Sequence, residues 1–255
     1  MEDNQTVRTN DGELALSLRD VHISYRVVRP ISVREILSGK QQKSRYYHAV
    51  KGVSFDMRKG EILGMIGKNG SGKSTLLRAV AGIYSPDAGA IETYGHSVGL
   101  MAIGVGFNND LSGRENIFLS GMLMGFTKKE IQERFDEIVD FAKLRDFIDE
   151  PVRSYSSGMH SKLAFSITAN MEPDIMLVDE TLSVGDTNFK RKSMKKMKQL
   201  IRSDDRTVLI VSHSLSVLEE LCERTVWMDD GVIRSIGPTR EILEEYQATS
   251  ENETE

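Results

Sequence analysis

Residues Gly67–Ser74 read GKNGSGKS, and they lie between a short apolar segment and a helical pattern. The pattern G-x-x-x-x-G-K-S is typical of a loop whose glycines let backbone N–H groups converge on phosphate oxygens. In such a loop Lys73 reaches the β- and γ-phosphates of a nucleotide, and the Ser74 hydroxyl binds Mg²⁺. A glycine turn with an incidental lysine is the alternative, which the position between a strand and a helix disfavours. The predicted phosphate site comprises Gly67, Lys68, Asn69, Gly70, Ser71, Gly72, Lys73 and Ser74.

The segments around this loop alternate between apolar strands and helical patterns. Before the loop, Glu61–Ile66 is the short apolar run of a buried parallel strand, and Asp174–Asp179 and Thr207–Ser212 repeat that pattern. A helical pattern begins at Lys73, and a basic amphipathic helix is expected over Phe189–Arg202. Strands that alternate with helices predict a parallel sheet with crossover helices.

The remaining patterns divide the chain into one domain and two tails. Apolar residues alternate along Leu14–Leu18 and Val53–Met57, which predicts further strands. Asp230-Gly231 between two apolar runs is a strong hairpin signal, and Thr239–Gln247 has the pattern of a closing helix. The predicted divisions are a flexible tail at 1–13, a single domain at 14–247 with a helical subdomain at 115–172, and a flexible tail at 248–255.

Composition favours a protein of the reducing cytosol. The chain has 255 residues, 39% of them hydrophobic and 28% charged, with a formal net charge of −5. The single cysteine, Cys222, excludes a disulfide framework, and no apolar run reaches the ~18 residues of a membrane span. The polar start has no secretory or transit pattern. Because the chain has no global basic bias, we expect no nucleic acid as a partner.

Polar side chains follow two of the predicted buried strands. Asp179 and Glu180 come directly after Ile175–Val178, at the edge where open α/β sheets bind ligands. Asp179 is suited to the hydration shell of Mg²⁺, and Glu180 to polarising an attacking water. His213 follows its own strand in the same way, and a neutral imidazole there would bond a γ-phosphate. Taken alone, each feature is also typical of an ordinary loop start.

A third feature is a helix start that lacks acidic residues. Ser156, Ser157 and Gly158 precede an apolar helix, and the first turn carries His160 and Lys162 instead. Free backbone N–H groups beside small hydroxyl residues form an anion site. A serine N-cap without a ligand is the alternative.

In this order the motifs resemble those of the ATP-binding subunit of ABC transporters, over residues 14–246. The resemblance implies an α/β fold: a P-loop NTPase (ABC ATPase) core with a mixed sheet, an antiparallel β subdomain and a helical subdomain. It implies hydrolysis of ATP with Mg²⁺, coupled to transport. It also implies a head-to-tail homodimer in which each ATP lies between the P-loop of one copy and the signature helix of the other. The implied roles are Walker A for Gly67–Thr75, including Thr75; metal binding for Ser74 and Asp179; catalysis for Lys73, Glu180 and His213; the signature motif for Ser156, Ser157 and Gly158; and the Asp-loop for Asp186.

Three departures from the general family are similar to one branch of it. The signature reads YSSGM, and a basic insertion spans 26–48. The segment 104–116, which ends in GREN, contains no glutamine where the family has one. These features resemble the exporters of O-antigen and teichoic acid. That branch implies a lipid-linked glycan, a permease in a separate chain and a place on the cytoplasmic side of the membrane. Asn108 is the nearest substitute for the glutamine, as a metal ligand, and a glycan-reading C-terminal domain of some relatives is not expected here.

Three points stay open at the level of sequence. The insertion has a short helical pattern between Pro30 and Gly39 with six cations around it, which fits either an anionic membrane surface or a solvated loop. Tyr25, or less favourably Tyr46 or Tyr47, would stack on adenine. The rival functions are the ATPase of another ABC transporter, a soluble non-transport ABC ATPase, and a regulatory nucleotide-binding module without turnover.

Overall fold

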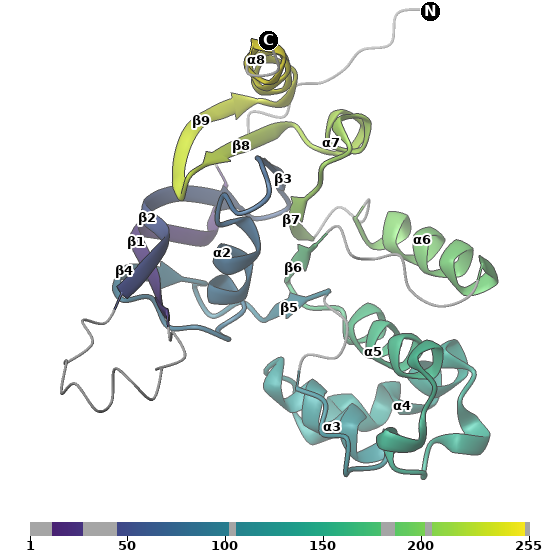
Figure 1. The fold of residues 1–255 in the computed structure, drawn as a ribbon. Helices are drawn as coiled ribbons and strands as arrows, with labels where there is room; N and C mark the ends of the chain where they lie inside the picture. Colours follow the sequence, from purple (N-terminus) through teal and green to yellow (C-terminus); the bar gives the residue numbers. More distant parts are fainter. Residues whose placement is uncertain (1–11, 28–44, 102–105, 180–186, 202–205, 253–255) are drawn as a thin grey trace, which may run out of the picture.

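A six-stranded mixed sheet positions the glycine-rich loop. The computed structural model describes residues 12–27, 45–101, 106–179, 187–201 and 206–252, and the sheet has the order β5-β6-β7-β3-β8-β9 (Figure 1). Its strands are parallel except for β9, which runs antiparallel to β8. The predicted mixed sheet with crossover helices is confirmed. The strands are β3 (Ile62–Ile66), β5 (Val98–Leu100), β6 (Ile175–Val178), β7 (Thr207–Val211), β8 (Arg224–Asp229) and β9 (Val232–Pro238).

A second, antiparallel sheet covers the loop side of the molecule in the order β2-β1-β4 (Figure 1). The long strands β1 (Leu14–Val27) and β2 (Arg45–Arg58) pair along their whole length, and β4 (Ala88–Glu92) completes the sheet. The insertion expected at 26–48 therefore begins and ends within paired strands. Its central part, with the helical pattern near Pro30, lies outside the described residues.

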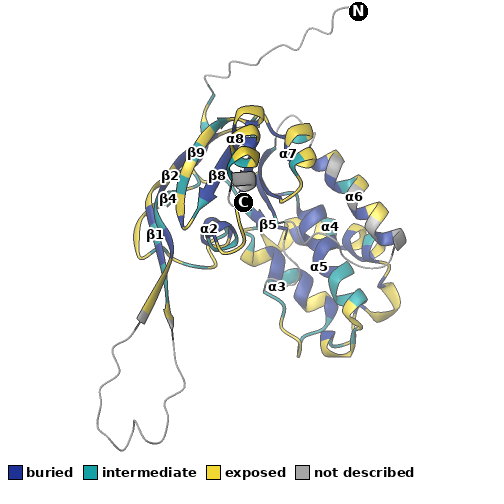
Figure 2. Cartoon of the chain, turned by 45° about the horizontal axis from the view of Figure 1, so that its top comes forward, coloured by how far each residue is buried: buried dark blue, intermediate teal, exposed yellow. Residues whose placement is uncertain are grey.

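Burial follows the alternation of side chains along β3. Leu63 and Met65 point into a core shared with the antiparallel sheet and with α2 (Lys73–Val80). Ile66 points to the opposite face, where Trp227 and helices after the sheet form a second core. Both faces of the strand are therefore buried, as expected for a parallel sheet between two layers. The neighbouring strand β8 is buried in the same way (Figure 2).

A separate helical lobe, residues 113–171, has a third core of its own. Its helices α3 (Gly113–Leu123), α4 (Lys128–Ala142) and α5 (Ser157–Met171) pack around buried aliphatic side chains such as Ile117 and Ile138. Capping boxes fix two of the helix starts, at Ser112 for α3 and Thr127 for α4. Two short 3₁₀ turns, η1 (Arg145–Phe147) and η2 (Val152–Ser154), connect α4 to α5.

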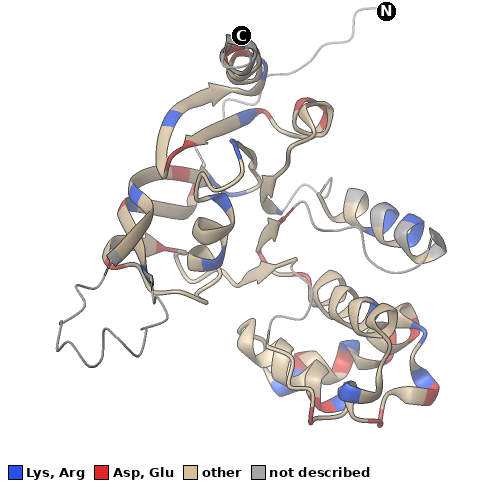
Figure 3. Ribbon diagram, in the orientation of Figure 1, with Lys and Arg blue, Asp and Glu red and all other residues tan. Residues whose placement is uncertain are grey.

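Three more helices cover the far face of the large sheet. They are α6 (Thr187–Ile201), α7 (Leu215–Leu221) and α8 (Thr239–Asn252). Lys and Arg gather on α6, whose sequence contains no Asp or Glu (Figure 3). Lys192 ties this helix to the lobe, because its Nζ donates to Phe141 O at 3.2 Å and lies 3.8 Å from the Phe141 ring centroid. Helix α8 continues to Asn252, so residues 248–252, expected in a flexible tail, extend the closing helix.

None of the helices in the described part of the chain is both long and apolar enough to cross a membrane.

Candidate functional site

Three neighbouring strands end at one cavity. β3 leads into the loop Gly67–Gly72, β6 into Asp179 and β7 into His213. Because β6, β7 and β3 are adjacent and parallel, their carboxyl ends meet at the same edge of the sheet. A cavity of about 180 Å³, here called the loop cavity, opens at this edge. Its lining includes Tyr47, Lys73, Ser74, Thr75, Asp179 and His213.

The backbone conformation of the loop requires glycine at two of its positions. Gly67 and Gly72 have φ angles of +151° and +100°, which side-chain-bearing residues rarely adopt. A Cβ atom at Gly67 would lie 2.1 Å from Met228 O, and one at Gly72 would lie 2.3 Å from Ala49 O. The loop is therefore pressed between β2 and β8, and its shape depends on the absence of Cβ atoms at these positions.

The loop ends at a helix start that is left open for an anion. Gly72 is the N-cap of α2, and no side chain in the described part of the chain caps it by a hydrogen bond. The first turn also contains no acidic residue. Backbone N–H groups and the positive end of the helix dipole therefore face the loop cavity, an arrangement that favours phosphate.

Lys73 is a buried cation that donates hydrogen bonds to oxygens of the glycine-rich loop. Its side chain is 5% exposed, and its Nζ donates to Gly67 O and Lys68 O at 2.7 Å each and to Ser71 Oγ at 3.3 Å. The ammonium group held in this way places a positive charge at the lining of the loop cavity, which suits a phosphate ligand.

The turn between β8 and β9 fastens the loop from outside. Gly231 N donates to Ser71 O at 3.1 Å, and Lys51 N donates to Gly231 O at 2.8 Å. Lys51 Nζ also lies 2.7 Å from Asp230 Oδ2. Sequence reasoning found this turn as a hairpin signal and missed its contact with the loop, because no local pattern joins segments about 160 residues apart.

Two tyrosines face the loop from the antiparallel sheet. Tyr47 is 49% exposed, lines the loop cavity and donates from its hydroxyl to Gly70 O at 3.2 Å. Tyr25, the first choice of the sequence for an adenine platform, is half-buried, and its hydroxyl bonds Thr75 Oγ1 at 3.1 Å. The accessible ring at the cavity is thus that of Tyr47, whereas Tyr25 is not among the cavity-lining residues that the structure describes.

The predicted signature residues stand at the start of α5, in the helical lobe. Ser156 is the N-cap, and its Oγ accepts a bond from Met159 N at 3.2 Å. Ser157 is exposed and Gly158 half-buried. His160 lies in the first turn with its ring centroid 4.8 Å from that of Phe107, and burial lowers the pKa of its imidazole. The structure does not bring this helix start into the lining of the loop cavity of the same chain.

Asn108, expected as a metal ligand, lies in the segment before α3 and is bonded to that helix. Its Oδ1 accepts from Asp110 N at 3.0 Å, and its backbone exchanges hydrogen bonds with the side chain of Asn116. The structure therefore does not place Asn108 with Ser74 and Asp179, because its amide closes a local turn. Asn116, which sequence reasoning did not single out, is fully buried and also donates to Leu111 O and Ser112 O. Glu180 and Asp186 lie outside the described residues.

Comparison with known proteins gives the family. A family model described as ABC transporter matches residues 50–183, more than half of the chain. The chain belongs to the ABC transporter family. A curated ABC relative, the O-antigen export system ATP-binding protein RfbB of Klebsiella pneumoniae, is 43% identical over 80% of this chain and 83% of its own length.

Two other relatives of this ABC transporter chain are longer proteins. The teichoic acids export ATP-binding protein TagH of Enterococcus faecalis is 44% identical over 85% of this chain and 48% of its own length. The O-antigen export system ATP-binding protein RfbB of Myxococcus xanthus is 43% identical over 83% of this chain and 48% of its own length. The chain therefore spans about half the length of these two proteins.

Solved structures confirm the ABC ATPase fold. A dimeric ATP-binding cassette in a post-hydrolysis state, bound to ADP and Pi, matches with a TM-score of 0.65 over 88% of this chain and 98% of that chain. An ATP-binding subunit of an ABC transporter matches with a TM-score of 0.68 over 91% of this chain and 93% of that chain. The identities are 21% and 20%, so these likenesses concern the fold alone.

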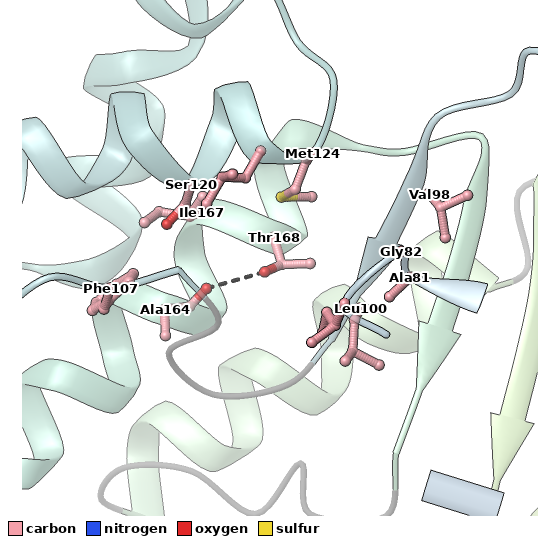
Figure 4. Close-up of a pocket in the computed structure, with 12 residues that line it drawn as sticks. Ala81, Gly82, Val98, Leu100, Phe107, Ser120, Met124, Ala164, Ile167 and Thr168 are labelled. Carbon is pink, nitrogen blue, oxygen red and sulfur yellow. Dashed lines mark hydrogen bonds between the residues drawn. The ribbon is translucent and has the colours of Figure 1, made fainter. Parts of the chain in front are cut away.

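A second cavity of this ABC transporter chain lies between its two parts. It has a volume of about 180 Å³ and is lined by α3 and α5 of the helical lobe, by β5, and by the segment after α2 (Figure 4). Leu123, at the end of α3, lines it and is 65% exposed, and Met122, the preceding residue, is 52% exposed. Ser120 Oγ is buried at its wall and has no hydrogen-bond partner among the described residues. We call it the apolar cavity.

Proposed function

We propose that this chain is the ATP-hydrolysing subunit of an ABC transporter that exports a lipid-linked cell-surface polysaccharide through a permease formed by another chain. The observation that carries the ATPase is the loop cavity, where Lys73, Ser74, Asp179 and His213 meet at one sheet edge. The export of a glycan such as O-antigen or teichoic acid is supported by the names of the relatives. The chain then works at the cytoplasmic side of the membrane.

The reaction is the hydrolysis of ATP to ADP and phosphate. The open start of α2 and the loop N–H groups hold the phosphates, and the buried Lys73 offsets the negative charge that develops on the transferred group. Glu180, next to Asp179, orients the attacking water and takes its proton. His213, exposed at the neighbouring strand end, bonds the terminal phosphate. The accessible ring of Tyr47 stacks on adenine, in place of the ring of Tyr25.

The donor set fits Mg²⁺. Ser74 and Asp179 line the same cavity, and hydroxyl and carboxylate oxygens are the ligands that this ion prefers. Mg²⁺ usually keeps several waters and binds through one or two protein ligands plus substrate phosphates. When bound, Mg²⁺ neutralises charge on the phosphates.

A second copy of the chain completes the site. The helix start at Ser157 and Gly158 lies outside the lining of the cavity of its own chain, and Ser157 is exposed. Its first turn lacks acidic residues, so its N–H groups suit an anion presented by another molecule. We therefore propose an ATP-bound head-to-tail homodimer, with Asp186 near the interface.

The ATPase assignment predicts that Glu180→Gln lowers the hydrolysis rate by about 10²-fold while ATP binding is retained, because the amide cannot accept the proton of the attacking water. Phosphate release and ATP binding are measured on the purified chain, with Glu92→Gln on the exposed strand β4 as the matched control. Equal hydrolysis rates for the wild type and Glu180→Gln would falsify a catalytic role for this carboxylate.

The transporter assignment predicts that the permease docks at the apolar cavity. Leu123→Glu places a charge on the exposed apolar end of α3. It should weaken co-purification with the permease at least about tenfold, because the permease would have to bury a charge in place of an apolar side chain. ATP hydrolysis by the isolated chain should stay unchanged, since the loop cavity is not altered. Lys129→Glu, at an exposed position of α4 in the same lobe, is the control. Undiminished co-purification of Leu123→Glu would contradict this docking site.

A further inference from the structure

Tyr25 and Tyr47 form a matched pair opposite the start of α2. They are directly opposite each other in the antiparallel pairing of β1 with β2, so their side chains share one face of the sheet. Both hydroxyls reach the loop region, but they meet different groups. Tyr47 donates to the backbone oxygen Gly70 O, whereas Tyr25 donates to the side-chain oxygen Thr75 Oγ1 at 3.1 Å.

The ring of Tyr25 is fixed in this position. It packs edge-on against Tyr84, with ring centroids 5.9 Å apart and an interplanar angle of 83°. Tyr84 is itself packed against the core between the two sheets. The phenol is therefore anchored at its ring and aimed by its hydroxyl at Thr75, which lines the loop cavity in the first turn of α2.

The hydrogen bond from Tyr25 affects where the hydroxyl proton of Thr75 points. A hydroxyl can donate one hydrogen bond and accept two, and Thr75 Oγ1 accepts one from Tyr25. A threonine in a helix ordinarily donates to a carbonyl three or four residues earlier. Among the hydrogen bonds of the described residues, those carbonyls, Gly72 O and Ser71 O, accept from Leu76 N at 2.9 Å and from Gly231 N at 3.1 Å, and neither accepts from Thr75 Oγ1. The Thr75 proton is thus left to an acceptor in the loop cavity.

We propose that Tyr25 is a positioning residue for nucleotide phosphate, acting through Thr75. By donating to Oγ1, Tyr25 turns the Thr75 hydroxyl proton toward a phosphate oxygen in the loop cavity, and the accepted bond makes Thr75 the stronger donor. This inference rests on the proposed nucleotide-binding function, and it gives Tyr25 a task that needs its hydroxyl and not the face of its ring.

The test is a double-mutant cycle on the full chain. Tyr25→Phe removes one oxygen and keeps the ring, Thr75→Val removes the hydroxyl, and Thr75→Ser keeps it. The affinities of each variant for a non-hydrolysable ATP analogue and for adenosine are measured by calorimetry, after thermal melting has established that the variants fold. Tyr46→Phe, on the exposed opposite side of β2, is the control.

We expect Tyr25→Phe to weaken the analogue about fivefold, in line with the loss of one hydrogen bond. Adenosine, which has no phosphate, should bind unchanged. Tyr25→Phe should cause no further loss in the Thr75→Val background, while its full effect should persist with Thr75→Ser. An unchanged affinity in Tyr25→Phe, an equal loss for adenosine, or an undiminished effect beside Thr75→Val would each overturn the inference. A wild-type chain that binds no analogue would instead overturn the proposed function.

Discussion

Replacing Lys73 with alanine should lower the rate of ATP hydrolysis by on the order of 10³-fold, because the reaction loses a preorganised positive charge in a buried site. Lys73 is 5% exposed and its ammonium group is already aligned by Gly67 O and Lys68 O, so it stabilises developing charge without reorganisation. Phosphate release by the purified variant measures the effect. In cells, the proposed transporter with this variant should leave its polymer inside.

Lys59→Ala is the matched control for this prediction. Lys59 is an exposed cation in the turn between β2 and β3, at the end of β3 that faces away from the loop, so the substitution removes the same charge without touching the loop. Its hydrolysis rate should equal that of the wild type. If Lys73→Ala retained more than a tenth of the wild-type rate while remaining folded, the role assigned to this ammonium group would be wrong.

Gly72→Ala should destabilise the folded chain by about 2–5 kcal/mol, the sum of an unfavourable φ and a steric overlap. The φ of +100° costs a side-chain-bearing residue energy wherever it occurs, and the new Cβ would also lie 2.3 Å from Ala49 O. That oxygen belongs to the paired strand β2 and has little room to move. Denaturant unfolding of the purified variant measures the loss.

Gly70→Ala separates the two costs. Gly70 has a similar φ of +83° in the same loop, but nothing lies within 4 Å of its Cβ position. Its substitution should therefore cost only the conformational part, about 1–2 kcal/mol. Equal losses at Gly70 and Gly72 would show that contact with Ala49 does not restrict the loop.

Much of the fold was predictable because its signals are local. The apolar run Glu61–Ile66, the glycines after it and the helix pattern from Lys73 each depend on neighbouring residues, and together they specify a strand, a loop and a helix. The position of Asp179 and His213 at one cavity could also be predicted from the sequence. Parallel strands that alternate with helices place their carboxyl ends at one edge.

The features that sequence reasoning missed depend on pairings between distant segments. Which of Tyr25 and Tyr47 offers an open ring is set by the register of two strands separated by residues 28–44, and no local pattern fixes that register. The metal-binding role of Asn108 stays a prediction. The bonds that set its surroundings, such as the one from Asn108 N to the buried Asn116, depend on how the lobe packs.

The hydrogen bond between Gly231 and Ser71 also has a consequence for folding during synthesis. A ribosome that adds about 5–20 residues per second makes the loop roughly ten to thirty seconds before it makes the turn that fastens it. During that interval the nascent chain contains every residue of the loop but not the turn between β8 and β9, whose Gly231 bonds to it. The ability to bind a nucleotide should therefore arise only after Gly231 has been synthesised and has left the ribosome.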